Sequence, residues 1–243
     1  MSPVTTDPLA AQHAAARRQG LSVGLATGIY GVSFGALGIA AGLDVWQTVA
    51  LSLLLFTGGS QFAFIGIIGA GGSPVTAVAT STLLGIRNGL YGLQLARVLR
   101  LTGWRRTAAA HVTIDESTAV ALAQEHPEVQ RTGFWAGGLG VFTFWNLSTL
   151  IGAVVGNAIG DPRVWGLDAA AAAAFVGLIW PRLRDRTGQV TAALAAAIAL
   201  IAFAPTPAGV PVLLAALAAV VVGLIDSAPS RARDIEQPEG DLL

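Results

Sequence analysis

The sequence predicts an all-α protein whose helices span a membrane. Of its 243 residues, 53% are hydrophobic and only 12% are charged, a composition outside the range of soluble globular proteins. Apolar runs long enough for a bilayer span lie at 21–43, 46–71, 73–96, 133–159, 166–181, 189–204 and 209–225. We therefore expect a polytopic helical membrane protein with about 6–8 membrane segments, the second of them broken or re-entrant.

The apolar runs predict a single helical transmembrane domain over 20–226. Residues 1–19 are polar, carry Arg17 and Arg18 just before the first run, and lack a cleavable signal pattern, so we expect a cytoplasmic N-terminal tail. Residues 227–243 are charged and contain proline, which predicts a disordered C-terminal tail. The net charge is zero, cysteine is absent and the three histidines are scattered. We therefore expect no nucleic-acid partner, no cofactor and no metal site.

Glycines recur along the first run at alternating steps of four and three residues. They are Gly24, Gly28, Gly31, Gly35, Gly38 and Gly42. This spacing places them on one face of a helix, and a glycine face lets a second helix approach closely. We interpret the face as a packing surface.

The second run, 46–71, is interrupted at its centre by the polar stretch "TGGSQ" at 57–61. The positive-inside rule places the arginine clusters at 17–18 and 97–106 on the same, cytoplasmic side. If the first three runs all crossed, these clusters would lie on opposite sides. A broken or re-entrant second segment removes the conflict, and its unpaired backbone groups predict a binding site. The alternative is a continuous helix whose small residues form a tight helix contact.

The third run carries an arginine in its interior. Arg87 lies fourteen residues after Ser73, where we expect the helix to begin, which corresponds to about 20 Å of helix at ~1.5 Å per residue. A charge at such depth is costly and faces a cavity or the interior of a helix bundle. Its guanidinium is suited to binding a carboxylate of a solute. A structural ion pair with an acid from another segment is the alternative.

Two adjacent acids, Asp115 and Glu116, lie in a moderately apolar segment between arginine clusters. If this segment dips into the membrane, one carboxylate can pair with Arg87 or carry a coupling proton. If the segment rests on the cytoplasmic surface, both acids are ordinary solvated side chains.

An enzymatic function is not expected. Ser60 follows two glycines, but "GGSQF" departs from the G-x-S-x-G nucleophile elbow, and no Walker phosphate-binding loop is present. Two non-enzymatic functions remain from the residues alone: a transporter, or a non-transporting membrane scaffold whose glycine faces hold a partner.

The segment from 31 to 99, which includes "FTGGSQF" and an arginine-containing helix with "LYGL", resembles the AzlC family of branched-chain amino-acid permeases. The later "TIDESTAVALA" and "GLDAAAAAAFVGLIWPRLRDR" are similar to further family segments, so the resemblance covers about residues 20 to 190. Around the arginine, Gly85 and Asn88 stand where the family often has Asn and His.

The resemblance implies export of branched-chain or other apolar amino acids through the cytoplasmic membrane, together with a small AzlD-like membrane subunit. The implied substrate-binding residues are Gly58, Gly59, Ser60, Gln61, Phe62, Arg87, Asn88 and Tyr91. Phe56, Phe62 and Phe64 are expected to contact the apolar side chain of the substrate. Asp115 and Glu116 are expected to serve in an ion pair or in proton coupling.

Overall fold

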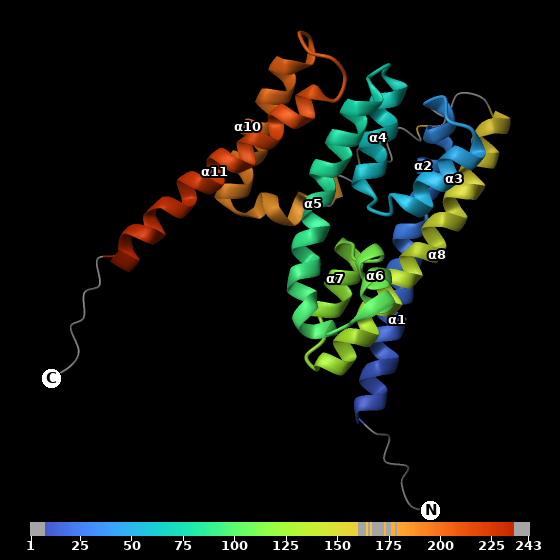
Figure 1. Ribbon diagram of the computed structural model, residues 1–243, viewed down its shortest axis with the longest axis vertical. Coiled ribbons are helices and arrows are strands. Elements are labelled where there is room, and N and C mark those ends of the chain that lie inside the picture. Colours follow the sequence, from blue (N-terminus) through green and yellow to red (C-terminus); the bar gives the residue numbers. More distant parts are fainter. Residues whose placement is uncertain are drawn as a thin grey trace, which may run out of the picture.

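The computed structural model describes residues 8–159 and 179–235, together with the isolated positions 164, 166, 173, 176 and 177. Every regular element in this part of the chain is a helix (Figure 1), which confirms the expected all-α class. The α-helices are α1 (Pro8–Gly28), α2 (Tyr30–Ala40), α3 (Val45–Leu54), α4 (Gly59–Gly69), α5 (Pro74–Leu99), α6 (Gly103–His111), α7 (Asp115–Leu122), α8 (Pro127–Ile159), α10 (Arg186–Phe203) and α11 (Val210–Ile235), and a short 3-10 helix, η2, covers Trp180–Arg184.

Within the described residues, three helical stretches are both long and apolar enough to cross a membrane: Pro8–Ala40, Pro127–Ala158 and Arg186–Phe203. The first combines α1 and α2, which meet at Ile29. α5 has 26 residues, but the polar side chains along it lower its apolar character. Most of the expected run 166–181 lies outside the described residues.

The rod formed by α1 and α2 lies parallel to α8, and glycines form the contact. A Cβ atom at Gly24 would lie 2.6 Å from the Gly140 backbone, and one at Gly31 would lie 2.6 Å from a backbone oxygen of α8. We call this contact the glycine seam; it consists of Gly20, Gly24, Gly28, Gly31 and Gly35 of α1–α2 and Gly152 and Gly156 of α8. The seam brings backbone against backbone, which maximises van der Waals contact where no hydrophobic driving force acts between helices.

Two glycines of the expected face, Gly38 and Gly42, are not part of the contact with α8. Gly38 faces Thr48 of α3, so it packs against the next helix of the chain rather than α8. Gly42 does not pack at all: nothing lies within 4 Å of its Cβ position, and its φ of +92° lies in the region that favours glycine. It follows the end of α2 and turns the chain toward α3, whose start is capped by the Asp44 carboxylate.

The segment 46–71 is a re-entrant hairpin made of α3 and α4. A Cβ atom at Gly69, the last residue of α4, would lie 3.2 Å from Ala41 at the end of α2, so the segment returns to the end of the molecule where it began (Figure 1). Its tip is formed by residues 55–58, and Gly58 there has a φ of +59°. The expected broken and re-entrant second segment is therefore confirmed.

A second hairpin, formed by α6 and α7, enters from the opposite end. There, Gln124 contacts Gln19 of α1 at 2.9 Å, and Arg131 of α8 donates to the Val98 carbonyl of α5 at 3.0 Å. Its own tip reaches the first hairpin, since Nε2 of His111 lies 2.9 Å from the carbonyl oxygen of Leu53. The acidic segment thus dips into the bundle rather than resting on its surface, and the two tips meet in the interior (Figure 1).

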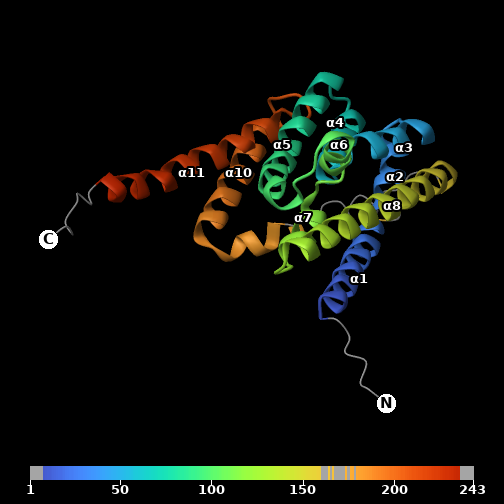
Figure 2. The ribbon, with the colours of Figure 1, turned by 60° about the horizontal axis from the view of Figure 1, so that its bottom comes forward.

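α10 and α11 form an antiparallel pair that projects away from the other helices (Figure 2). The loop between them contacts the first hairpin, where a Cβ atom at Gly72 would lie 3.1 Å from Ala208. α1 begins at Pro8 and α11 continues to Ile235, so helix extends past the expected boundaries at 19 and 227 on both sides. At the N-terminus the reason is local: the segment is rich in alanine and arginine, strong helix formers, and begins with proline at the first helical position.

Candidate functional site

A pocket of about 330 Å³ lies where the two hairpin tips approach α1, α2 and α8. This volume falls within the range of small-molecule sites. Its apolar wall consists of Phe56, Phe62, Ile114, Val141 and Trp145. Its polar lining consists of Thr27, Tyr30, Thr57, Arg87, Asp115 and Glu116, and backbone or small side chains at Gly58, Gly59, Ala173 and Gly177 complete it.

An ion pair links α5 to the tip of the second hairpin. Nη2 of Arg87 lies 2.8 Å from Oδ2 of Asp115, and the two side chains are 30% and 20% exposed. The Tyr91 hydroxyl donates a hydrogen bond to Oδ1 of the same carboxylate at 2.7 Å. Asp115 is therefore held by two groups of α5.

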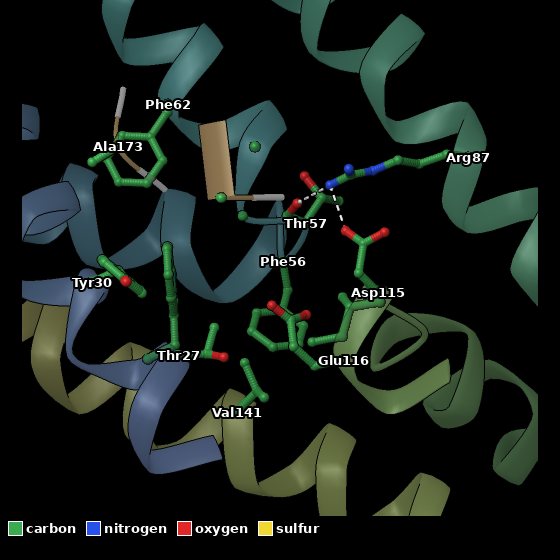
Figure 3. A pocket seen from close by; sticks show the side chains of 15 residues that line it. Thr27, Tyr30, Phe56, Thr57, Phe62, Arg87, Asp115, Glu116, Val141 and Ala173 are labelled. Atoms are coloured by element: carbon green, nitrogen blue, oxygen red, sulfur yellow. Dashed lines mark hydrogen bonds and ion pairs between the residues drawn. The ribbon is translucent and has the colours of Figure 1, made fainter. Parts of the chain in front are cut away.

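Arg87 also reaches the tip of the first hairpin. Its Nη2 lies 3.4 Å from the carbonyl oxygen of Thr57, a long hydrogen bond (Figure 3). One guanidinium thus contacts both tips at once, as the dashed lines in Figure 3 show. Any solute that competes for this guanidinium would alter the connection between the hairpins.

Glu116 lines the same pocket, one residue after Asp115 in the first turn of α7. Within the described part of the chain it forms no ion pair, since Arg87 pairs with Asp115. The Arg87–Asp115 pair leaves no formal net charge, so Glu116 is the remaining acidic group of the lining. The pocket therefore offers a position suited to a cationic group or a proton.

Three polar atoms around the pocket have no hydrogen-bond partner within the described residues. They are Nε of Arg87, Oγ1 of Thr57 and Nε1 of Trp145, and all three are buried. Buried polar groups in native proteins are nearly always paired. These groups, each able to donate a hydrogen bond, are available to water or to a polar solute in the pocket.

Helix ends add to the polarity of the site. α4 begins at Gly59 and α7 at Asp115, so both helices direct their amino-terminal ends, which carry partial positive charge, toward the meeting tips. α7 has acids in its first turn, whereas α4 has none. The start of α4 is accordingly the free anion-favouring end, as in transporters with discontinuous helices.

Four of the eight expected substrate-binding residues line the pocket: Gly58, Gly59, Phe62 and Arg87. Ser60 and Gln61 are fully buried and lie elsewhere. Nε2 of Gln61 donates to the Ser52 carbonyl at 3.2 Å, and the Ser60 carbonyl accepts from Ser81 at 3.1 Å. The Gln61 side chain is thus directed to α3, and the Ser60 hydroxyl lies 3.7 Å from the Cβ position of Gly85 in α5, so neither lines this pocket. Their role as ligands stays a prediction.

Asn88, Tyr91 and Phe64 also lie outside the pocket lining. Asn88 lines a separate cavity of about 520 Å³ on another face of α5, one helical step from Arg87. Tyr91 acts through Asp115, and Phe64 packs against the core cluster that includes Phe34 and Trp145.

The pocket also contains residues that the sequence did not single out. Thr27 and Tyr30 come from the α1–α2 rod, and Val141 and Trp145 come from α8. No motif marks them, because their part in the site depends on helices that are far apart in sequence. Only the unpaired Nε1 of Trp145 signals a functional position, and that signal requires the structure.

A family model described as AzlC protein matches residues 22–159, more than half of the chain. The chain is 28% identical over 186 residues to an uncharacterized membrane protein of Helicobacter pylori strain J99, covering 76% of this chain and 81% of the relative. It is 29% identical over 206 residues to the inner membrane protein YgaZ of Escherichia coli K12, covering 79% and 80%.

A third relative, an uncharacterized membrane protein of Archaeoglobus fulgidus, is 30% identical over 173 residues, covering 70% of this chain and 75% of the relative. No solved structure matches the chain. The matched range 22–159 includes both re-entrant hairpins and nearly the whole lining of the pocket. The chain therefore belongs to the AzlC protein family and is a membrane protein.

Proposed function

We propose that this protein is a secondary transporter that exports branched-chain or other apolar amino acids across the cytoplasmic membrane, with both termini on the cytoplasmic side. The observation that carries the proposal is the pocket between the two re-entrant tips, which combines a guanidinium, two carboxylates and an apolar wall. The gathering of the arginine-bearing ends of α1, α5 and α8 at one end of the bundle supports the orientation.

The pocket is complementary to a zwitterionic amino acid. The substrate carboxylate would bind Arg87 and Thr57, whose side chains have hydrogen-bond donors without a partner among the described residues. It would lie beside the start of α4, whose backbone N–H groups carry partial positive charge. Its ammonium group would bind Glu116, the acid that no described arginine neutralises. Its apolar side chain would contact Phe56, Phe62 and Val141. This division of charges and apolar surface disfavours solutes that lack any one of the three parts.

The ion pair of Arg87 provides a way to couple binding to movement. A substrate carboxylate at Arg87 would compete with Asp115, and Asp115 connects α5 to the second hairpin. Weakening that connection would let α6 and α7 move relative to the first hairpin, so that the tips open in turn to either side. Protonation of Asp115 would weaken the same ion pair, whereas protonation of Glu116 would weaken its attraction for the substrate ammonium, and this is our proposed proton coupling.

We further propose that a small AzlD-like membrane subunit accompanies the chain. The support is the free face of α5, where Cβ positions at Gly89 and Gly92 meet nothing within 4 Å and Leu93 is 71% exposed. Open glycines and exposed leucine are features of a surface that another transmembrane helix can contact closely.

The main argument for the alternative function, a non-transporting membrane scaffold, no longer holds. It required the glycine face of the first run to hold a partner, but Gly24, Gly28, Gly31 and Gly35 are covered by α8 of the same chain. A scaffold would also have no use for unpaired donors around an internal pocket.

The test is efflux of preloaded leucine, isoleucine and valine from cells that express the chain, with and without a candidate small subunit. Arg87→Gln is compared with the matched control Arg97→Gln, the same substitution ten residues further along α5 at an exposed position. We expect efflux in the wild type and the control but not in Arg87→Gln, at equal membrane abundance. If no amino acid moves in any combination, or if Arg87→Gln exports normally, the proposal is wrong.

A further inference from the structure

A groove of about 590 Å³ runs along the surface between α1 and α8, separate from the pocket at the hairpin tips. It lies beside the glycine seam, and Gly140 of α8, which faces Gly20 and Gly24, lines it. We call it the α1–α8 groove. Its walls are apolar along most of their length and include Leu21, Trp135, Leu139 and Phe144.

One end of the groove carries two arginines, Arg17 of α1 and Arg131 of α8. Nε of Arg131 donates to the Val98 carbonyl at 3.0 Å, which holds its guanidinium in place at the groove. Neither arginine forms an ion pair with a described acid, and no acidic side chain lines the groove. This end of the groove therefore carries two positive charges without an acidic partner among the described residues.

The two arginines lie among other polar side chains at this end of the helix bundle. Next to them, Nδ1 of His13 lies 2.7 Å from Oγ1 of Thr132, and Gln19, two residues after Arg17 on α1, accepts a hydrogen bond from Gln124. Beyond this level the groove extends to Phe144, thirteen residues after Arg131 on α8, which corresponds to about 20 Å of helix. One leaflet of hydrocarbon is roughly 15 Å thick, half of the ~30 Å core. The groove is thus long enough to accommodate an acyl chain across one leaflet.

We propose that the α1–α8 groove binds one anionic phospholipid. The headgroup phosphate lies between Arg17 and Arg131, and one acyl chain follows the apolar wall past Leu139 to Phe144. Basic pockets between transmembrane helices on one side of a membrane bind acidic headgroups in this manner. The two uncompensated charges select the phosphate, and the length and apolar lining of the groove select an attached acyl chain. The lipid would cover the outside of the seam on which the α1–α2 rod depends.

A transmembrane helix from another protein is the competing occupant. The charges argue against it, because a helix would need to supply acidic groups for two arginines at one level while remaining apolar for the next three turns. The phosphodiester of a lipid provides this combination in one molecule.

The test uses the purified full-length chain in mild detergent, with phosphatidylglycerol and phosphatidylcholine of identical acyl chains as probes and native mass spectrometry as the readout. We expect one phosphatidylglycerol to be retained in preference to phosphatidylcholine. In Arg17→Gln/Arg131→Gln, binding of phosphatidylglycerol should weaken on the order of thirtyfold, about fivefold for each arginine. The matched control is Arg18→Gln/Arg97→Gln, which removes two arginines that do not line the groove.

A second variant tests the acyl-chain part. Thr143 is exposed and lines the far part of the groove, so Thr143→Trp should obstruct it without disturbing the seam. We expect weaker retention of long-chain phosphatidylglycerol and unchanged retention of a six-carbon-chain analogue. The proposal is overturned if the control double variant loses phosphatidylglycerol as strongly as the groove variant, if phosphatidylcholine is retained equally well, or if site-specific cross-links from Leu139 in membranes capture a protein helix.

Discussion

The glycine seam and the pocket at the hairpin tips share α8 but are built in opposite ways. In the seam, side chains are absent and backbones touch, so each position tolerates no added atom. In the pocket, charged and polar side chains surround a space of about 330 Å³, and three of their buried polar atoms are unpaired. We therefore expect the seam to contribute mainly to the stability of the bundle and the pocket to contribute mainly to the proposed ligand binding. Substitutions should therefore separate the two properties.

The largest effect is expected at the seam. A Cβ atom at Gly35 would overlap the backbone of Thr149 and Ala153, which cannot move without separating α2 from α8. We expect Gly35→Ala to cost more than about 4 kcal/mol and to abolish recovery of folded protein. The measurement is the yield and thermal midpoint of monodisperse protein in detergent. Gly66→Ala in α4 is the matched control, because nothing lies within 4 Å of that Cβ position; equal yields of the two variants would contradict the backbone contact.

The next effect concerns the ion pair of the pocket. Arg87→Gln leaves Asp115 without its cation, and we expect a loss of about 1–3 kcal/mol, less than for fully buried pairs because both side chains are partly exposed. Arg87→Gln/Asp115→Asn should recover most of this stability, since no uncompensated charge remains, yet should still fail to bind or export amino acids. Thermal unfolding and efflux are measured on the same preparations. A double variant that regains efflux would show that the pair is structural only.

Gln61 tests whether a buried polar residue outside the pocket lining contributes to stability or to ligand binding. It is fully buried and donates to the Ser52 carbonyl, so Gln61→Ala should destabilise the first hairpin by about 1–3 kcal/mol without changing amino-acid affinity in the protein that remains folded. Ser60→Ala is the matched control, because the Ser60 hydroxyl has no described partner and its removal should cost little. Thermal midpoints and ligand titrations distinguish the cases. Lost affinity at unchanged stability would instead place Gln61 in the binding site.

The smallest effect is expected at Trp145, which belongs to both regions. Its carbonyl contacts Gly31 in the seam, while its ring lines the pocket with an unpaired Nε1. Trp145→Phe keeps an aromatic ring but removes the donor, so amino-acid affinity should fall about three- to tenfold, as for one hydrogen bond of about 1 kcal/mol. Stability should change little. An unchanged affinity, measured by titration, would mean that Nε1 does not contact the ligand.

The sequence predicted the first hairpin better than the second, for a physical reason. A polar break inside an apolar run is visible as a contrast, and the positions of the arginine clusters favoured a run 46–71 that returns over a continuous helix. The segment of α6 and α7 is only moderately apolar and mixes charged with apolar residues, so nothing in it distinguishes a surface helix from a hairpin held inside a bundle. Its position became evident only from contacts such as that of His111 with the Leu53 carbonyl.

The predictions of individual site residues also differ in how well the local sequence could support them. A pair between Arg87 and one of the acids Asp115 and Glu116 was one of two alternatives that the sequence offered, because a deep charge requires a partner and depth can be read from position along a helix. Ser60, Gln61 and Asn88 were predicted to bind substrate because they lie in or next to the motifs that contain Gly59 and Arg87. A sequence motif does not specify the direction of a side chain. Whether a residue faces the pocket depends on where its helix begins, and α4 begins at Gly59, which turns Ser60 and Gln61 toward other helices.

The sequence by itself determined that this protein is an all-α membrane protein, favoured a broken second segment and offered a pair between a deep arginine and an acid as one alternative. These properties follow from local quantities: hydropathy, helical period and the cost of an unpaired charge in an apolar medium. Only the tertiary structure decided that two hairpins meet from opposite ends, that Trp145 and Val141 close the pocket, and that Gly42 turns the chain while Gly35 packs. Those features depend on contacts between helices distant in sequence, which no local pattern specifies.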